Sequence, residues 1–213
     1  DDPEKLAQAA VYCATEFARF KGYDPVQDCQ LLAPMYKGPA GVIALNDYLQ
    51  KLLNPCPEDS FARHGDVTWG IGDKLMQTKN DYQTGLLNGD IGILRAIHRD
   101  QTGKKVEWIE IEVDGEAIAV DSSGFSNLTL AYACTVHKFQ GSQCKVVVMC
   151  LHTSHFILLQ RNMLYTGTTR AQELMVLCCS ERAVELAVKN DKIKKRNTWL
   201  KEKLDSQLEV AHV

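Results

Sequence analysis

The fold class of this chain is decided by one stretch, YACTVHKFQGSQ at residues 132–143, which the apolar run VVVMCL follows at residues 146–151. The run has apolar residues on both faces, a pattern typical of a central strand in a parallel sheet. The polar residues before it predict a short turn of helix that begins at Thr135 and ends at Gly141 in a left-handed conformation. Because a helix start offers free backbone N–H groups, this stretch is a candidate for contact with an anion such as phosphate.

Helix and strand patterns alternate on both sides of this stretch. An apolar stripe predicts a helix over residues 3–20, capped by Asp2, and a second amphipathic helix covers residues 41–53. Buried strands are expected at residues 29–33, 145–151 and 174–179, and helices at residues 158–168 and 181–189. Such alternation predicts an α/β layer with a mostly parallel sheet.

The middle of the chain, from about residue 61 to residue 128, has frequent glycines and no helical stripe. Short alternating runs predict strands at residues 74–78, 91–97, 106–113 and 116–120. LNGD at residues 87–90 and VDGE at residues 113–116 contain the Asn-Gly and Asp-Gly pairs of hairpin turns. Short strands joined by tight turns predict a small β-barrel inserted into the α/β layer.

We therefore expect four segments. Residues 1–62 and 129–191 would form the two parts of the α/β domain, and residues 63–128 the barrel insert. Residues 192–213 would form a basic, amphipathic C-terminal tail, for which a solvated terminus is an equally good interpretation.

The bulk composition is that of a globular protein without a general attraction for polyanions. Hydrophobic residues make up 45% of the 213 residues, and the formal net charge is -3, so any binding of nucleic acid has to come from local patches. No apolar run approaches the roughly 20 residues that a membrane-spanning helix needs. The chain starts with DDPE, which is neither a signal peptide nor an initiator methionine, and this favours a fragment of a longer protein.

The eight cysteines include no C-x-x-C pair and lie mostly among apolar residues, which favours buried free thiols in a reducing cytoplasm. Cys144, Cys150, His152 and His155 have spacings like those of metal ligands. If residues 145–151 form a strand, however, the two cysteines lie about 20 Å apart and cannot share one zinc ion. We therefore expect no metal site.

Two polar clusters contain the candidate functional residues. The first is the turn at residues 135–141, in which His137 is either a functional group or a residue that helps the turn to pack. The second is YTGTTRA at residues 165–171, where Arg170 ends a helix directly before a buried strand and is placed to reach an anion. The alternative for Arg170 is a surface ion pair with a carboxylate such as Glu173.

Taken together and in this order, the clusters resemble motifs of superfamily-one helicases. Residues 135–142 resemble the fifth helicase motif and residues 165–171 the sixth. QLLAPMYKGPAG at residues 30–41 resembles the fourth motif of the RecD-like branch, and residues 72–92 resemble the SH3-like insert of that branch. The resemblance covers about residues 1–190. It implies a second RecA-like motor domain, with a parallel sheet flanked by helices and an inserted SH3-like β-barrel.

The resemblance assigns five residues to the nucleotide. Arg170 would be the arginine finger that stabilises charge on the γ-phosphate of ATP, and Lys37 would be the fourth-motif cation near the same phosphate. Gln140, Gly141 and Gln143 would contact the nucleotide. Lys37 stands where an arginine is expected, and Gln143 where a glutamate is expected, so charge or hydrogen bonding is kept in a weaker form.

The resemblance assigns five further residues to DNA. Thr135, His137 and Lys138 would contact the backbone of a single strand. Asn80 and Tyr82, in the insert, would grip the same strand or brace the duplex junction.

The implied function is the C-terminal motor half of an ATP-dependent 5′-to-3′ DNA helicase of recombination and repair, such as a RecD-like helicase or the α-subunit of exodeoxyribonuclease V. The chain contains no G-x-x-x-x-G-K-[ST] segment and no acidic magnesium-binding motif. ATP and Mg²⁺ would therefore be bound in the full-length protein, and the chain alone is expected to be inactive.

The expected partners are single-stranded DNA or a duplex junction, the N-terminal RecA-like domain of the same protein, and other exonuclease subunits, but no membrane. Two alternatives remain. One is a non-enzymatic helicase remnant that binds nucleic acid or protein through its barrel. The other is the helicase part of a conjugative relaxase.

Overall fold

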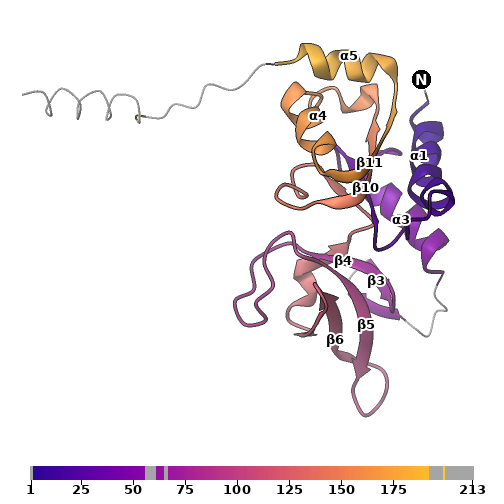
Figure 1. The fold of residues 1–213 in the computed structure, drawn as a ribbon. Helices are drawn as coiled ribbons and strands as arrows, with labels where there is room; N and C mark the ends of the chain where they lie inside the picture. Colours follow the sequence, from indigo (N-terminus) through magenta and orange to yellow (C-terminus); the bar gives the residue numbers. More distant parts are fainter. Residues whose placement is uncertain (1, 56–60, 65–66, 192–198, 200–213) are drawn as a thin grey trace, which may run out of the picture.

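The computed structural model describes residues 2–55, 61–64, 67–191 and 199, and it places a parallel sheet beside an antiparallel one (Figure 1). The parallel sheet has four strands in the order β11-β10-β1-β9, and the antiparallel sheet has five in the order β7-β6-β5-β4-β8. A separate pair, β2 and β3, completes the antiparallel part. The expected α/β class and the inserted β-structure are both confirmed.

The parallel sheet is built from β1 (Cys29–Ala33), β9 (Ala133–Thr135), β10 (Cys144–Leu151) and β11 (Ala171–Cys179). The apolar run of β10 is buried on both faces, as expected for a strand that lies between β11 and β1. Val146 and Val148 belong to one hydrophobic core, whereas Val147 and Met149 belong to another. Successive side chains of a strand point to opposite faces, so the side chains of β10 pack into the hydrophobic cores on both faces of the sheet.

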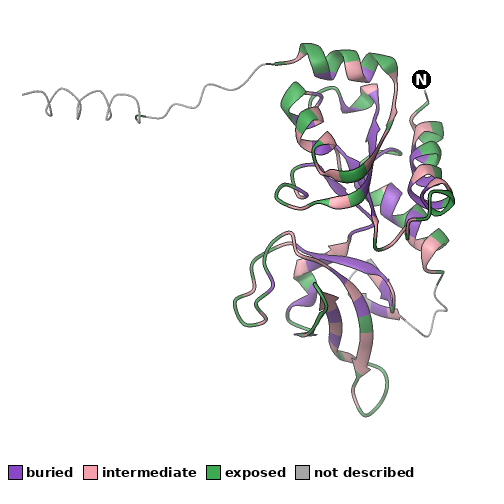
Figure 2. Ribbon diagram, viewed as in Figure 1, coloured by how far each residue is buried: buried purple, intermediate pink, exposed green. Residues whose placement is uncertain are grey.

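One face of the sheet is covered by α1 (Pro3–Tyr12), a π-helical turn (Cys13–Phe17), α2 (Ala18–Phe20) and α3 (Val42–Leu53). The other is covered by α4 (Arg161–Thr168) and α5 (Glu181–Lys189). Figure 2 shows the buried residues in the strands and on the inner sides of these helices. Across the described ranges, none of the helices has the length and apolar character needed to cross a bilayer.

The helix starts follow the expected capping chemistry. The Asp2 carboxylate accepts the Glu4 N–H at 2.9 Å, and the Ser180 side chain accepts the N–H of Ala183 at 3.4 Å. The helix expected from residue 158 begins only at Arg161, because residue 158 belongs to a turn that follows the 3₁₀ turn at residues 153–155, with the Leu158 N–H bonded to His155 O at 2.8 Å. The tail expected at residues 192–213 lies outside the described residues except for Trp199.

The antiparallel part comprises β2 (Phe61–His64), β3 (Val67–Gly70), β4 (Lys74–Gln77), β5 (Ile91–Arg99), β6 (Val106–Val113), β7 (Glu116–Asp121), a 3₁₀ turn (Phe125–Asn127) and β8 (Leu128–Leu130). The sequence did not predict β2, β3 or β8, which are too short to show alternation. Because β8 pairs with β4, the antiparallel sheet continues to Leu130, beyond the expected end at residue 128.

The two expected hairpin turns have different outcomes. Asp114 (φ 51°) and Gly115 (φ 84°) form a tight turn between β6 and β7, as predicted. The turn at residues 87–90 forms, with Asp90 N–H bonded to Leu87 O at 3.1 Å, but it does not join two strands directly. It closes a long connection over residues 78–90, so its interpretation as a simple hairpin was wrong.

A buried carboxylate fixes the insert to the motor layer. The Asp73 side chain accepts hydrogen bonds from Gln50 Nε2 at 2.6 Å, Asn54 Nδ2 at 2.8 Å and Tyr132 Oη at 2.7 Å, and from the Gly70 N–H at 2.7 Å. Gln50 and Asn54 belong to the end of α3, so these bonds tie the start of β4 to the helix that covers the parallel sheet. The insert is thereby held in one position relative to the motor layer.

Candidate functional site

The polar turn after β9 is not the helix that the sequence predicts. Thr135 ends β9, and residues 136–141 form successive turns. The Thr135 hydroxyl accepts the Lys138 N–H at 3.2 Å, the Phe139 N–H bonds to Thr135 O at 3.1 Å, and Gly141 is left-handed, with φ 93°, as expected. The helix prediction was therefore wrong, although the hydroxyl cap and the final glycine are present.

The sheet register explains this difference. Thr135 is level with Ala33 at the carboxyl end of β1, whereas Cys144 precedes Val146, the residue level with Cys29. Between Thr135 and Cys144 the chain must therefore return along the strand direction by about six residue positions, four from Ala33 to Cys29 and two from Val146 to Cys144. At 3.3 Å per residue, residues 136–143 have to span about 20 Å. A helix of these eight residues would rise only about 12 Å, so the segment has to be more extended than a helix.

A groove of about 850 Å³ lies at the carboxyl ends of β1 and β9. It is lined by the loop after β1, the turn after β9, Asn88 of the insert and Leu158 of the loop after β10. Ligands of open α/β sheets bind beyond the carboxyl ends of the strands, and this groove has that position. Five of the predicted site residues line it, namely Lys37, Thr135, His137, Lys138 and Gln140.

The loop that carries Lys37 is folded tightly over the start of α3. The Val42 N–H bonds to Met35 O at 2.9 Å, and the Ile43 N–H bonds to Tyr36 O at 3.1 Å. A Cβ atom at Gly41 would lie 2.5 Å from Lys37 O, so the loop requires glycine there. These bonds occupy N–H groups at the start of α3, so what the loop offers a ligand is its exposed side chains, above all Lys37.

Lys138 connects the motor layer to the insert. Its ammonium group donates to Asn88 Oδ1 at 3.0 Å and to Thr78 O at 3.4 Å. The Asn88 N–H donates to Asn80 Oδ1 at 2.9 Å, and Asn80 Nδ2 donates to Tyr82 Oη at 3.4 Å. The predicted residues Asn80 and Tyr82 are thus joined to the groove through Asn88, which the sequence analysis treated only as a turn residue.

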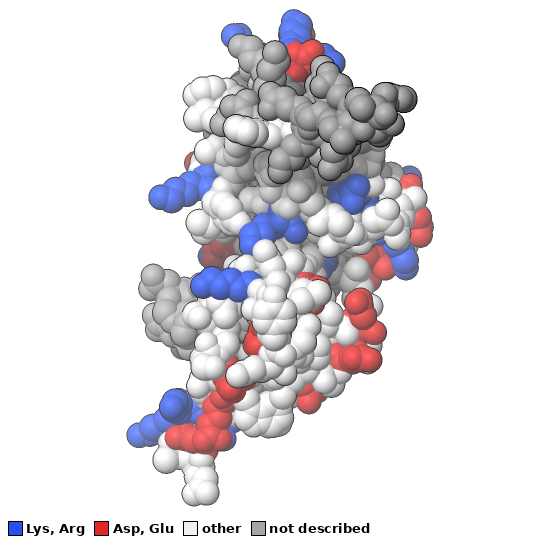
Figure 3. Space-filling model, turned by 90° about the vertical axis from the view of Figure 1, so that its left-hand side faces the viewer, with Lys and Arg blue, Asp and Glu red and all other residues white. Residues whose placement is uncertain are grey.

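The surface around the groove has an uneven charge distribution. Figure 3 shows the side of the molecule to which the connection at residues 78–90 projects in Figure 1. Lysine and arginine side chains lie across the middle of this face, and acidic side chains lie mostly below and to the right (Figure 3). No acidic side chain is among the described residues that line the groove, whereas Lys37 and Lys138 are.

Arg170 lies at the opposite edge, directly before the first residue of β11. Its guanidinium donates to Thr166 O at 3.1 Å, to Ser142 O at 3.3 Å and to the Thr169 hydroxyl at 3.2 Å. The alternative ion pair with Glu173 is not formed, since Glu173 Oε2 accepts the Tyr23 hydroxyl at 2.9 Å. Among the described residues, the partners of Arg170 are therefore neutral oxygens on its own helix end and on the turn before β10.

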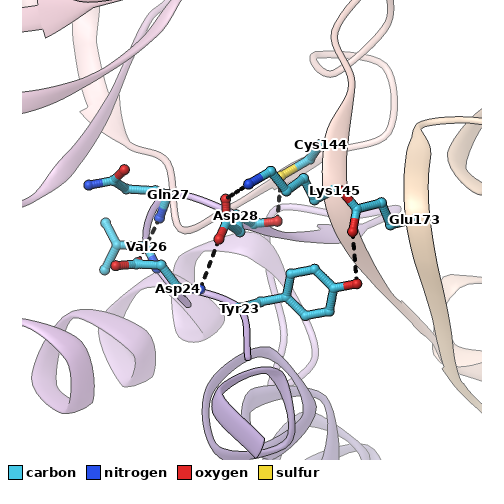
Figure 4. A network of polar contacts seen from close by, with 8 residues as sticks. All are labelled: Tyr23, Asp24, Val26, Gln27, Asp28, Cys144, Lys145 and Glu173. Carbon is cyan, nitrogen blue, oxygen red and sulfur yellow. Dashed lines mark hydrogen bonds and ion pairs between the residues drawn. The ribbon is translucent and has the colours of Figure 1, made fainter. Parts of the chain in front are cut away.

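The acidic groups at this edge have partners of their own (Figure 4). Lys145 Nζ lies 2.9 Å from Asp28 Oδ1, and this bond is the main reason why the pKa of Asp28 is lowered and that of Lys145 is raised. The hydrogen bond to Glu173 raises the pKa of Tyr23. These pairs link the loop before β1 to β10 and β11, and they leave the carboxylates already engaged.

The register separates Lys37 from Arg170. Ala171 is level with Cys144, about 20 Å along the strand direction from Ala33, and Lys37 lies beyond Ala33 while Arg170 lies before Ala171. The two residues therefore lie toward opposite edges of the sheet. Lys37 lines the groove together with Thr135 and His137, and its expected position near the same phosphate as Arg170 stays a prediction.

The three remaining nucleotide candidates are also divided between the edges. Gln140 lines the groove, whereas Gln143 lines a smaller cavity of about 300 Å³ between the amino edge and the insert. Gln143 Oε1 accepts a hydrogen bond at 3.3 Å from Nε2 of Gln172, which is two residues after Arg170 in the sequence. Gly141 is exposed between them. The turn thus has one end at each edge of the sheet.

The four residues with spacings like those of metal ligands are part of the strand β10 and of the turn that follows it. Cys144 and Cys150 lie toward opposite ends of β10, and burial raises the pKa of Cys150 to about 12. The His152 N–H donates to His155 Nδ1 at 3.2 Å, and burial lowers the pKa of His155 to about 4. In the described ranges, no group of three His, Cys, Asp or Glu side chains is arranged to hold a metal ion.

Family models and curated relatives match this chain along most of its length. The model of the SH3 domain of ATP-dependent RecD-like DNA helicases matches residues 45–108, and that of the UvrD-like helicase C-terminal domain matches residues 130–178. The ATP-dependent RecD2 DNA helicase of Deinococcus radiodurans is 36% identical over 176 residues, which are 82% of this chain and 23% of that protein. The RecBCD enzyme subunit RecD of Mycolicibacterium smegmatis is 30% identical over 178 residues, which are 82% of this chain and 29% of that protein.

Solved structures of Pif1 helicases share the fold. A Pif1 helicase from a structure of DNA unwinding at forked duplex DNA matches with a TM-score of 0.53 and 18% identity. The match covers 97% of this chain and 53% of the Pif1 chain. Pif1 from Candida albicans matches with a TM-score of 0.50 and 15% identity. The match covers 95% of this chain and 58% of the Candida chain.

The parallel sheet with its antiparallel insert is the fold of a helicase motor domain. Within that class, the chain is a RecD-like superfamily-one helicase sequence. It spans less than a third of the length of the two curated relatives named above.

Proposed function

We propose that this chain is the C-terminal motor half of an ATP-dependent DNA helicase that moves 5′ to 3′ along a single strand. The observation that carries the proposal is the segment from Thr135 to Gln143. One end of it lines a groove whose described lining contains no acidic residue, and the other end lies beside Arg170. A single short segment would thus reach both the proposed nucleotide edge and the proposed DNA edge, an arrangement that suits coupling of ATP hydrolysis to movement along DNA.

The amino edge is the proposed nucleotide edge. The Arg170 guanidinium bonds only to neutral oxygens among the described residues, so an incoming γ-phosphate has no carboxylate to displace. An arginine donates several N–H groups in a fixed geometry and suits the charge that develops on a transferred phosphoryl group. Gln143 lies at this edge of the turn. The phosphate loop and the Mg²⁺ ligands would come from an N-terminal RecA-like domain.

The carboxyl edge is the proposed DNA edge. Lys37 and Lys138 are spaced along the groove, and contacts of this kind position a nucleic-acid backbone without reading its sequence. Thr135 and His137 add shorter polar side chains to the floor. We therefore assign Lys37, together with Gln140, to DNA rather than to the nucleotide.

The turn between the edges is held by apolar side chains. Val136 and Phe139 are buried in the core that also contains Met149 and Leu151 of β10. Because protein interiors are densely packed, a displacement at one end of this turn is transmitted through those contacts rather than absorbed. This is the physical basis that we propose for coupling between the two edges.

The test is Arg170→Ala in a longer protein that includes this chain and its phosphate loop. We expect DNA-stimulated ATP hydrolysis to fall about 10³-fold or more, as for other arginine fingers, with single-strand binding nearly unchanged. Arg161→Ala is the matched control, because Arg161 is an exposed arginine at the other end of the same helix, near Asp191. DNA-stimulated hydrolysis that survives in Arg170→Ala would contradict the assignment.

A further inference from the structure

The loops around the groove present large apolar side chains to solvent. Tyr36, on the loop after β1, is 51% exposed and lines the groove itself. Leu87 is 51% exposed beside Asn88, and Phe156 and Ile157 are 64% and 66% exposed just before Leu158. Each of these side chains is a groove-lining residue or a near neighbour of one in the sequence. An exposed aromatic ring that lines a concave site, on loops with further exposed apolar side chains, indicates a ligand with apolar surface of its own.

The chemistry of the groove narrows the class of that ligand. Lys37 follows Tyr36 directly, and Lys138 stands on the turn after β9, so cations and an aromatic ring line the same groove. An unpaired polynucleotide presents both phosphates and free base faces, whereas a duplex keeps its base faces stacked inside. An apolar peptide would make no use of the lysines, and a simple anion would make no use of the ring.

Tyr36 is held on a rigid support. Its carbonyl accepts the Ile43 N–H at 3.1 Å, and that of Met35 accepts the Val42 N–H at 2.9 Å. The left-handed Gly38 (φ 96°) and the close approach of Gly41 to Lys37 O fix the rest of the loop. A ring on a fixed loop loses little conformational entropy when a flat ligand stacks on it.

We propose that Tyr36 is a base-stacking residue, whose ring covers one face of an unpaired base while Lys37 and Lys138 contact the adjoining phosphates. The proposal rests on the proposed function, in that it takes the groove as the path of a single strand. It adds a contact to the base itself, which the lysines do not make. It also explains how the groove would prefer an unpaired strand to a duplex.

The experiment compares two oligonucleotides of equal length with the 213-residue chain. One is oligo(dT) and the other has the same phosphates but abasic sugars, and binding is followed by fluorescence anisotropy at low salt. We expect Tyr36→Leu to weaken binding of oligo(dT) about 5- to 150-fold, the range for loss of one stacked base, and to leave the abasic strand unaffected. Tyr36→Phe should bind like the unaltered chain. Lys37→Ala should weaken both strands by the same factor.

Tyr12→Leu is the matched control, because Tyr12 is 59% exposed on α1, away from the groove. If Tyr36→Leu binds oligo(dT) as tightly as the unaltered chain, the stacking proposal is wrong, but the assignment of the carboxyl edge to DNA is not contradicted. An equal loss on both strands would mean a backbone contact, and a loss in Tyr36→Phe would mean a hydroxyl contact, and either result overturns stacking. If the unaltered chain binds neither strand, the DNA edge itself fails.

Discussion

The two edges of the parallel sheet both present cations, but in different electrostatic settings. At the amino edge, Asp28 and Glu173 are engaged by Lys145 and Tyr23, and Arg170 is held by several oxygens in one position. At the carboxyl edge, Lys37 and Lys138 are spread along an open groove. The first arrangement suits one phosphate in a fixed position, and the second suits an extended polyanion. Arginine and lysine differ in this way chemically, since arginine has a rigid fork of donors and lysine a mobile point charge.

The turn that joins the edges gives the largest expected effect on stability. Phe139→Ala removes a buried ring from the core beneath the turn, and we expect it to lower the free energy of unfolding by about 3–5 kcal/mol in urea denaturation. Phe139→Leu keeps most of the apolar volume and should cost less than about 1.5 kcal/mol. Tyr165→Ala, at a 69% exposed ring, is the control and should change little. An equally stable Phe139→Ala chain would mean that the turn is not fixed to the core.

Lys37→Ala sharpens the division between the edges. In a longer protein with its phosphate loop, we expect single-strand binding to weaken about 5- to 10-fold at low salt, with the salt slope reduced by about one. The rate of ATP hydrolysis at saturating DNA should stay the same, because Lys37 does not face the nucleotide edge. Lys51→Ala, on the exposed side of α3, is the control. A large fall in hydrolysis at saturating DNA would mean that Lys37 contacts the nucleotide, and it would contradict the proposed division between the two edges.

The ion pair at the amino edge gives the smallest effect, and it depends on pH. The pKa of Asp28 is lowered mainly by its bond to Lys145, so the pair stabilises the folded chain above the unfolded pKa of about 4. That contribution is lost as the pH falls through the lower folded pKa. Asp28→Asn should therefore cost a little stability at pH 7, far less than Phe139→Ala, and nothing near pH 2. A difference from the unaltered chain that persists at pH 2 would rule out the charge as its cause.

Much of the fold follows from local patterns. The bounds of β1 and α5 match the sequence prediction, because a short, mostly apolar run and a capped amphipathic helix are specified by adjacent residues. β2, β3 and β8 were not predicted, because strands this short exist only by pairing with distant partners. The helix expected at Thr135 failed for a related reason, since the distance between the ends of β9 and β10 overrides the local preference.

The candidate site shows the same division. Sequence motifs alone selected Arg170, Thr135, His137 and Lys138, because each motif is defined by short spacings between residues along the chain. Only the tertiary structure could place Lys37 across the sheet from Arg170, since that separation depends on the register of β1, β10 and β11. The sequence by itself thus determined the α/β class, the insert and the family of this protein. The structure decided which cations share an edge, because residues distant in sequence meet through strand pairing and not through spacing along the chain.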